Sequence, residues 1–403
     1  MVRGEPLYLI HFSDLHLGIE SYGPLDPQTG VSSRVRDFLD RLDEVVDYAL
    51  KSEVDAVLFC GDAYKGRNPL PTYERELAYR VKKLADAGIP VILVGGNHDL
   101  PEHPQKASSL DIFSALKVPN VYVFRRPGVI RLETRRGSLQ IAAMPYPPRA
   151  FIRTLKEEKG WEEFKIEEEL QKLAQEIDPK IPSVLAGHFS VIGARYGSEK
   201  AIILGDDFEV PRSVLLSGPW DYVALGHIHC FQDLNPGNQP PVIYSGSLER
   251  IDFSEEHESK GFVKVHLRKG ETTWDFIPVK ARPFLTIEAD VRGEKEAEKI
   301  LMNKLQAYKE KVSGAVVRVK VKMKEGQRLN EEKVRELLSN CYYFVGVEKE
   351  IERRSRFTAG PEALDPSDWR GLLKEYFKAK KFSEEEIELL LKYAEKLIRE
   401  VEE

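Results

Sequence analysis

Cysteine is scarce in this chain of 403 residues, which contains only Cys60, Cys230 and Cys341. The three lie far apart and form none of the paired spacings that hold a zinc ion or a disulfide framework. Because disulfides accumulate in oxidising compartments, their expected absence favours a reducing, cytoplasmic location. The first residues lead directly into an apolar, strand-like run, so we expect no secretory leader.

Long hydrophobic runs and an excess of positive charge are also missing. No stretch approaches the roughly 18 apolar residues of a membrane-spanning helix, so no membrane segment is expected. The net charge of −6 gives the chain no overall field that would attract nucleic acid. A DNA-binding protein of this charge would need local basic patches or bound cations, so the charge neither supports nor excludes DNA as a substrate.

The N-terminal two thirds of the chain alternate short apolar runs with helical patterns. Residues 8–12, 56–60 and 90–94 are rich in β-forming side chains, and a polar motif follows each run at once. Residues 34–51 and 73–87 carry apolar side chains at helical spacing. The alternation predicts a layered α/β fold with helices on the outside.

The pattern changes after residue 280. Residues 281–350 repeat strands and helices on a smaller scale without a catalytic-type cluster, which predicts a small α+β domain. Residues 351–364 are rich in charge and broken by Gly360-Pro361, as is typical of a linker. The end of the chain predicts two amphipathic helices, which either fold back on the main body or dock against another protein's helices. The predicted domains are residues 1–280, residues 281–350, a linker over 351–364, and residues 365–403.

Five short polar motifs each follow one of the apolar runs, and they contain five of the nine histidines. They are Asp14-X-His16, Gly61-Asp62, Gly96-Asn97-His98-Asp99, Gly187-His188 and Gly226-His227-X-His229. Carboxylate, amide and imidazole groups delivered from several strand ends are the ligands that a two-metal hydrolytic centre requires. Asp62 is the natural bridge between two cations, because the preceding glycine allows close backbone approach. Each motif alone is weak evidence, but all five in this order make a coincidence improbable.

The five motifs, in this order, resemble the signature of the calcineurin-like metallophosphoesterases. Further segments resemble, more narrowly, the SbcD-type family of double-strand-break repair nucleases. They are residues 188–191, 197–199, 221–229, 244–253 and 260–262. The resemblance covers nearly the whole chain. It implies a sandwich of two mixed sheets flanked by helices, a small α+β capping domain that binds DNA, and a C-terminal helix-loop-helix.

The resemblance also implies a role for each residue of the motifs. It places Asp14, His16, Asp62 and His229 around one metal, and Asp62, Asn97, His188 and His227 around the second. His98 would stabilise the phosphate in the transition state and assist departure of the 3′ oxygen, with Asp99 as its orienting partner. Manganese is the usual activating metal of the family, so two Mn²⁺ per subunit are expected. The ligand types by themselves leave iron, zinc and magnesium open.

Two positions depart from the family pattern. Many relatives carry a histidine three residues after the bridging aspartate, where this chain has Lys65. Lys65 and Arg67 are candidate DNA contacts, although ordinary loop charges explain them equally well. Cys230 replaces a basic residue common in relatives, and we interpret it as a spectator. His11 lies outside the motifs, within the first apolar run, and is expected to be a packed core residue.

The function implied by the resemblance is a manganese-dependent DNA nuclease of double-strand-break repair. It would act as a 3′-to-5′ exonuclease on duplex ends and as an endonuclease on single strands or hairpins. The family forms homodimers and assembles with an SbcC-type ATPase into a heterotetramer, in which residues 365–403 would grip the base of the ATPase coiled coil. A cytoplasmic, nucleoid-associated location follows from that function.

Two alternatives remain in view. The first is a phosphatase or a small-molecule phosphodiesterase with the same metal pair. Protein phosphatases of this superfamily carry Gly-Asp-X-Val-Asp-Arg-Gly at the bridging position, whereas this chain has Gly-Asp-Ala-Tyr-Lys-Gly-Arg over residues 61–67. The second is a catalytically silent scaffold for DNA ends, which is disfavoured because every expected ligand position is filled.

Overall fold

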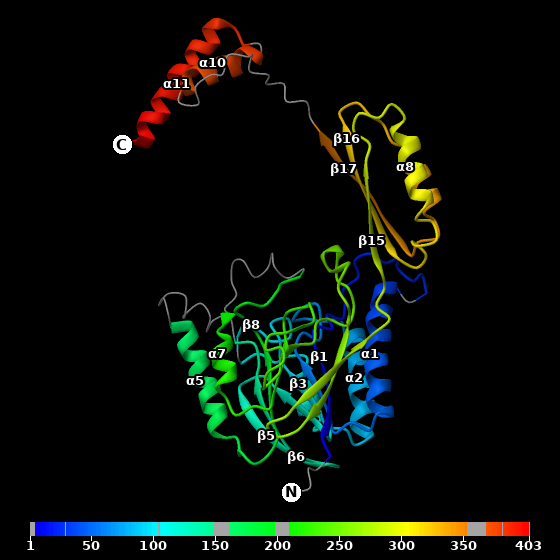
Figure 1. Ribbon diagram of the computed structural model, residues 1–403, viewed down its shortest axis with the longest axis vertical. Coiled ribbons are helices and arrows are strands. Elements are labelled where there is room, and N and C mark those ends of the chain that lie inside the picture. Colours follow the sequence, from blue (N-terminus) through cyan, green and yellow to red (C-terminus); the bar gives the residue numbers. More distant parts are fainter. Residues whose placement is uncertain are drawn as a thin grey trace. The chain divides into compact units, whose positions relative to one another are not determined.

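The computed structural model describes residues 5–28, 30–103, 105–147, 161–197, 209–352, 368–380 and 382–402 (Figure 1). Contacts within the chain divide it into two units. The first comprises Met1–Ile287, Leu305–Arg318 and Glu332–Gly346, and the second comprises Glu288–Lys304, Val319–Glu331 and Val347–Glu403. All five polar motifs belong to the first unit.

The first sheet of the larger unit is six-stranded, with the order β14-β13-β1-β2-β3-β4. Its strands are β1 (Leu7–Phe12), β2 (Ala56–Cys60), β3 (Val91–Val94), β4 (Val121–Phe124), β13 (Gly261–Leu267) and β14 (Thr273–Pro278). Strands β1 to β4 run parallel to one another, whereas β13 is antiparallel to both β1 and β14. Parallel neighbours need long crossovers, and α1 (Ser33–Lys51) and α2 (Pro71–Asp86) provide two of them.

The second sheet is also six-stranded, with the order β11-β12-β10-β7-β6-β5. Its strands are β5 (Gly128–Thr134), β6 (Gly137–Met144), β7 (Ser183–His188), β10 (Tyr222–Gly226), β11 (Gln232–Asp233) and β12 (Val242–Tyr244). The central pairs are parallel, and antiparallel pairs of β5 with β6 and of β11 with β12 close the two edges. Both sheets are therefore mixed, as the family resemblance implied.

Side chains that alternate along each strand build the layers. In β2, Val57 and Phe59 pack against α1 and α2, whereas Leu58 and Cys60 pack against the second sheet. This follows from the two-residue period of a strand, which points successive side chains to opposite faces. The outer face of the second sheet is covered by α5 (Trp161–Gln175) and α7 (Arg212–Leu216), so helices flank the two sheets on both sides (Figure 1). The four layers confirm the predicted α/β fold class.

The C-terminal part contains a three-stranded sheet with the order β15-β16-β17. Its strands are β15 (Phe284–Asp290), β16 (Val316–Lys324) and β17 (Tyr343–Glu352), and the helices α8 (Ala297–Gln306) and α9 (Glu331–Leu337) lie between them in sequence. The α+β character expected for residues 281–350 is thus present. The contact-based division assigns the first residues of each strand to the first unit and the remaining residues to the second, so the boundary at residue 280 stays a prediction.

The chain ends in two helices, α10 (Trp369–Ala379) and α11 (Glu384–Glu402). Asp368 caps α10 by accepting a hydrogen bond from the Gly371 amide at 2.9 Å. Ser383 and Glu386 form a reciprocal capping box at the start of α11. The linker predicted for residues 351–364 lies outside the described residues from 353 onward. Across the described ranges, every helix is too short or too polar to cross a membrane.

Candidate metal centre

Three of the motifs follow β1, β2 and β3, and the other two begin in the last residues of β7 and β10. They therefore meet where the carboxyl ends of the two sheets lie together. Backbone hydrogen bonds join the loops there, since the His16 amide donates to the Asp62 carbonyl at 3.0 Å. The Tyr146 amide, after the end of β6, donates to the Gly95 carbonyl after β3 at 3.0 Å and so joins the two sheets. Side chains far apart in sequence are thereby brought to one edge.

Several of these residues have a left-handed backbone. The φ angles of Asp14, His16, Asp62 and His227 are 53°, 47°, 60° and 96°. Each such residue costs on the order of 1–3 kcal/mol unless its surroundings hold it in place. The surroundings do so here, because the His227 amide donates to both oxygens of Asp14 at 3.0 and 3.1 Å. Strained backbone concentrated at one edge is typical of a functional site.

Two glycines make room for the polar side chains. A Cβ on Gly61, whose φ is 92°, would lie 2.2 Å from Nδ1 of His188. A Cβ on Gly96 would lie 2.1 Å from Oδ1 of Asp62. Any larger residue would displace His188 or Asp62, so glycine is required at both positions.

Around the first cluster, His16 and His229 direct their ring nitrogens toward each other. Their Nε2 atoms are 2.9 Å apart, and Nε2 of His16 is 3.6 Å from Oδ2 of Asp62. Asp14 completes a group in which one donor atom each from Asp14, His16 and His229 lies within 4.8 Å of the others. This donor set fits a divalent cation of the borderline type.

The second cluster forms on the other side of Asp62. Its Oδ1 atom lies 3.4 Å from Nε2 of His188, while Oδ2 faces His16. Oδ1 of Asn97 is 3.0 Å from Nε2 of His188 and 3.2 Å from Nδ1 of His227. The two oxygens of Asp62 face different histidines, which fits the bridging role expected for it, and that role stays a prediction. The structure therefore brings all seven expected ligand residues together.

The sequence of the chain matches a known protein family. The family described as calcineurin-like phosphoesterase matches residues 7–231, a range that runs through all five motifs. The chain belongs to the calcineurin-like phosphoesterase family. Divalent metals are the cofactors of this family, and the clustered aspartate and histidine donors fit them.

This phosphoesterase is also similar to individual proteins. It is 28% identical over 279 residues to SbcD, a component of the nuclease SbcCD of Bacillus subtilis (strain 168), which covers 66% of this chain and 68% of that protein. It is 27% identical over 308 residues to the DNA double-strand break repair protein Mre11 of Haloferax volcanii, which covers 72% of this chain and 56% of that protein. A dimetal phosphatase crystal structure from Danio rerio matches with a TM-score of 0.42 at 12% identity, over 68% of this chain and 96% of that chain. The first two matches confirm the resemblance to SbcD-type and Mre11-type proteins.

His98 of the phosphoesterase lies at the mouth of the cluster, where its side chain is 32% exposed. Its Nε2 atom is 4.0 Å from Oδ2 of Asp62, and its Nδ1 atom is 2.8 Å from the carbonyl oxygen of Lys65. His98 also belongs to a group with His16 and Asp62 whose donor atoms lie within 4.8 Å of one another. A metal-facing position is therefore open to His98, in addition to the phosphate-facing role predicted for it.

Asp99 occupies a different place from the one expected. Its carboxylate accepts hydrogen bonds from the backbone amides of Asp62, Ala63 and Gly96 at 2.8, 2.9 and 3.0 Å. Burial, together with the nearby Asp62 carboxylate, raises the pKa of Asp99 to about 6. The partner of the His98 ring is the Lys65 carbonyl, so Asp99 holds the loop of the bridging aspartate instead of orienting His98. Sequence spacing could not reveal this, because the contact depends on backbone amides.

The charges within the cluster are set by burial and by Asp62. Burial lowers the pKa of His16 well below its usual value, which keeps this imidazole neutral at pH 7. Burial also opposes protonation of His188, but the Asp62 carboxylate outweighs it and raises the pKa of His188 to about 9. An imidazole must be neutral to bind a metal, so a cation that binds at His188 displaces a proton.

Residues outside the motifs support the ligands, and the sequence did not single them out. Ser13 donates to Oδ2 of Asp14 at 2.5 Å. Nδ1 of His229 is 3.0 Å from Oε1 of the buried Glu255. A signal did exist, because Glu255 lies between two of the segments that carried the resemblance, but nothing local tied it to a histidine.

The remaining predicted residues take ordinary positions. The Lys65 side chain is exposed, and Arg67 pairs with Glu102 at 3.0 Å, so DNA contacts by Lys65 and Arg67 stay predictions. Cys230 is half-buried. His11 is confirmed as a core residue, because it is fully buried with its ring nitrogens beside the Tyr222 hydroxyl and the Leu225 carbonyl.

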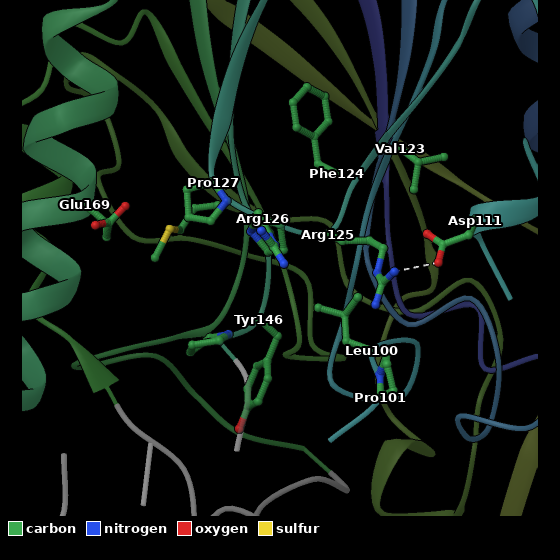
Figure 2. Close-up of a pocket in the computed structure, with 13 residues that line it drawn as sticks. Leu100, Pro101, Asp111, Val123, Phe124, Arg125, Arg126, Pro127, Tyr146 and Glu169 are labelled. Carbon is green, nitrogen blue, oxygen red and sulfur yellow. Dashed lines mark hydrogen bonds and ion pairs between the residues drawn. The ribbon is translucent and has the colours of Figure 1, made fainter. Parts of the chain in front are cut away.

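A pocket of about 540 Å³ lies next to Tyr146 of the phosphoesterase. Its lining is largely apolar, and Figure 2 shows Tyr146 on one side with Arg125 paired to Asp111 at 2.6 Å on the other. The Tyr146 ring also lies against the metal-site histidines, with its centroid 5.7 Å from that of His227 and 6.3 Å from that of His188. Tyr146 therefore links the pocket to the cluster, but the residues that line the pocket include none of the candidate metal ligands.

Proposed function

We propose that the chain is a metal-dependent DNA nuclease that hydrolyses phosphodiester bonds at DNA ends. Its activities would be 3′-to-5′ exonuclease action on duplex ends and endonuclease action on single strands and hairpins. The observation that carries the proposal is the placement of Asp62 between two clusters of ligand side chains. Similarity to SbcD and to Mre11 supports DNA over other phosphoesters.

The clusters fit two cations, and we propose Mn²⁺ for both. Asp14, His16 and His229 would hold one, Asn97, His188 and His227 the other, and Asp62 would bridge them. When bound, two such cations supply an activated water and neutralise charge on the phosphate. The chain contributes fixed ligand positions, since the left-handed backbone and the hydrogen bonds at this edge are already in place before any ligand binds.

His98 is proposed as the group that assists departure of the 3′ oxygen. A carbonyl oxygen only accepts hydrogen bonds, so Nδ1 of His98, beside the Lys65 carbonyl, carries a hydrogen. Its Nε2 atom is therefore the one that exchanges a proton with the substrate, and its exposure at the mouth gives substrate access. The Lys65 carbonyl keeps the ring in this orientation.

We further propose a homodimer that assembles with an SbcC-type ATPase into a heterotetramer. The C-terminal helices support a docking role, because several of their apolar side chains remain accessible, although Ile387 and Leu391 are buried. Leu389, Tyr393 and Leu397 of α11 are 56%, 59% and 62% exposed. Exposed apolar patches on helices are typical of surfaces that another protein covers. DNA access gated by the ATPase, and a cytoplasmic, nucleoid-associated location, follow from this proposal.

One assay tests the proposed function. The full chain is incubated with Mn²⁺ and a labelled hairpin or linear duplex, and in parallel with a phosphomonoester dye. We expect cleavage of the DNA and little turnover of the dye. The opposite result would favour the phosphatase alternative, and no turnover of either would favour the silent scaffold.

A pair of variants tests the role of His98. His98→Leu is expected to retain Mn²⁺ binding and lose DNA cleavage, on the order of 10²-fold or more, because proton transfer is removed. His103→Leu is the matched control, since His103 is an exposed histidine outside the cluster. Retained cleavage in His98→Leu would reject the role, and lost Mn²⁺ binding would identify His98 as a metal ligand.

A further inference from the structure

We infer that Glu255 is a positioning residue for the metal ligand His229, and that Lys260 holds the Glu255 carboxylate in place. The inference rests on the metal centre proposed above. Glu255 lies in a short 3₁₀ helix, Phe253–Glu255, whose N-cap residue is Asp252. Its contact with the cluster is made through the imidazole of His229.

The first step concerns the hydrogen on His229. Oε1 of Glu255 lies 3.0 Å from Nδ1 of His229, and the Glu255 side chain is completely buried. A carboxylate paired with a lysine can only accept, so Nδ1 is the nitrogen that carries the hydrogen. Nε2 is left with its lone pair, 2.9 Å from Nε2 of His16 and directed into the cluster. A carboxylate behind a ligand histidine fixes the tautomer and the ring orientation that a metal requires.

The second step concerns the carboxylate itself. Its other oxygen, Oε2, lies 2.8 Å from Nζ of Lys260 and also accepts from the Ile251 amide at 3.0 Å. The Lys260 ammonium is fully buried and donates to Glu258, to the Ser247 hydroxyl at 2.8 Å and to the His229 carbonyl at 3.1 Å. Lys260 therefore contacts both the backbone of the ligand residue and the carboxylate behind its ring.

The third step concerns the segment that carries Glu255. The Arg250 guanidinium donates to the carbonyl oxygens of Glu255, Glu258 and Arg282 at 3.2, 2.7 and 3.0 Å. The segment is thereby anchored to the chain that leads into β15. A buried ion pair generally stabilises a fold no better than well-packed apolar side chains do. We therefore infer that these contacts act mainly by orienting His229, and that their contribution to the stability of the fold is secondary.

The test measures Mn²⁺ affinity of the full chain by calorimetry, beside its unfolding temperature without metal and the kcat and KM for DNA. Glu255→Gln should weaken Mn²⁺ binding about 10-fold or more, the usual effect of removing a group behind a ligand. The loss of activity should shrink at high Mn²⁺, because excess metal compensates for weak binding. Glu258→Gln is the matched control, since Glu258 contacts the same Lys260 nitrogen and should leave Mn²⁺ affinity unchanged.

A second variant separates orientation from folding. Glu255→Gln removes the partner of the buried Lys260 ammonium and should lower the unfolding temperature. In Glu255→Gln/Lys260→Met that ammonium is also gone, so the unfolding temperature should recover in part while Mn²⁺ affinity stays low. Unchanged affinity in Glu255→Gln would overturn the inference, as would affinity that recovers together with stability in the double variant. An unaltered chain that binds no Mn²⁺ would overturn the metal centre itself, and this inference with it.

Discussion

At the edge of the two sheets, the polar side chains of Asp14, Asp62 and His188 are almost completely buried, whereas in α11 the apolar side chains of Tyr393 and Leu397 are 59% and 62% exposed. Each arrangement is unfavourable on its own. Buried ionisable groups lose their hydration, and exposed apolar groups order water or invite association. The contrast fits the proposal that both parts are completed by binding, with a pair of cations at the sheet edge and an apolar protein surface at α11.

The largest effect is expected from removal of the proposed bridging carboxylate at the sheet edge. Asp62→Asn is expected to reduce DNA cleavage on the order of 10³-fold or more, because in the proposed centre this carboxylate would hold both cations, which would activate the water. Calorimetry with Mn²⁺ and a cleavage assay check this. Asp86→Asn, which removes only a surface pair with Lys82, should leave both measurements unchanged. Substantial cleavage by Asp62→Asn would show that the edge is not a two-metal centre.

The exposed side of the comparison is tested in α11. Leu397→Asp is expected to weaken binding of an SbcC-type coiled-coil fragment roughly 30-fold, as for a residue at the centre of an apolar interface. Cutting of single strands with Mn²⁺ should be retained, because the metal centre is untouched. Lys392→Ala, an exposed charge on the same helix, is the control.

Deletion of residues 365–403 extends this test. If the helices only dock a partner, the truncated chain stays folded and active on single strands. If truncation instead unfolds the remaining chain, the helices fold back on the main body and the docking proposal fails.

A third experiment compares His11, a buried polar residue of the core, with the buried polar residues of the candidate metal centre. His11 is fully buried, and its two ring nitrogens have hydrogen-bonding partners within the protein, the Tyr222 hydroxyl and the Leu225 carbonyl. Burial lowers the pKa of His11 to about 3. The unfolded chain protonates this histidine below its ordinary pKa and the folded chain does not, so stability falls as pH falls. Between pH 7.5 and pH 5 the unaltered chain should lose about 2 kcal/mol more unfolding free energy than His11→Gln. Equal losses in denaturant unfolding of the two proteins would contradict this.

The smallest expected effect concerns the loop beside the bridge. Lys65→Ala should raise KM for DNA only a few-fold. It should also reduce the slope of log binding constant against log salt concentration by the amount expected for about one phosphate contact. Arg67→Ala should have less effect, because Arg67 is paired with Glu102. A large fall in kcat for Lys65→Ala would place its side chain in the chemistry, beyond the contact that its carbonyl makes with His98.

The elements that carry the site were predictable because their signals are local. The apolar run at residues 56–60 became β2, and the helical pattern over residues 34–51 became α1, which begins at Ser33 after a cap at Ser32. The hydrophobic period fixes such elements without knowledge of their neighbours. The boundaries of the C-terminal domains were less accessible, since they depend on which strands share contacts.

From the sequence alone, the carboxylate, amide and imidazole groups near the ends of apolar strands predicted metal chemistry. The resemblance to the calcineurin-like family then predicted which seven residues are the ligands. Only the tertiary structure decided how they are used. In the folded chain, the Asp99 carboxylate accepts hydrogen bonds from backbone amides around Asp62, and the His98 ring contacts the Lys65 carbonyl. The Glu255 carboxylate contacts the His229 ring on the side away from the cluster. Such partners are chosen by distance and burial in space. The spacing of the motifs along the chain does not indicate which residues become such partners.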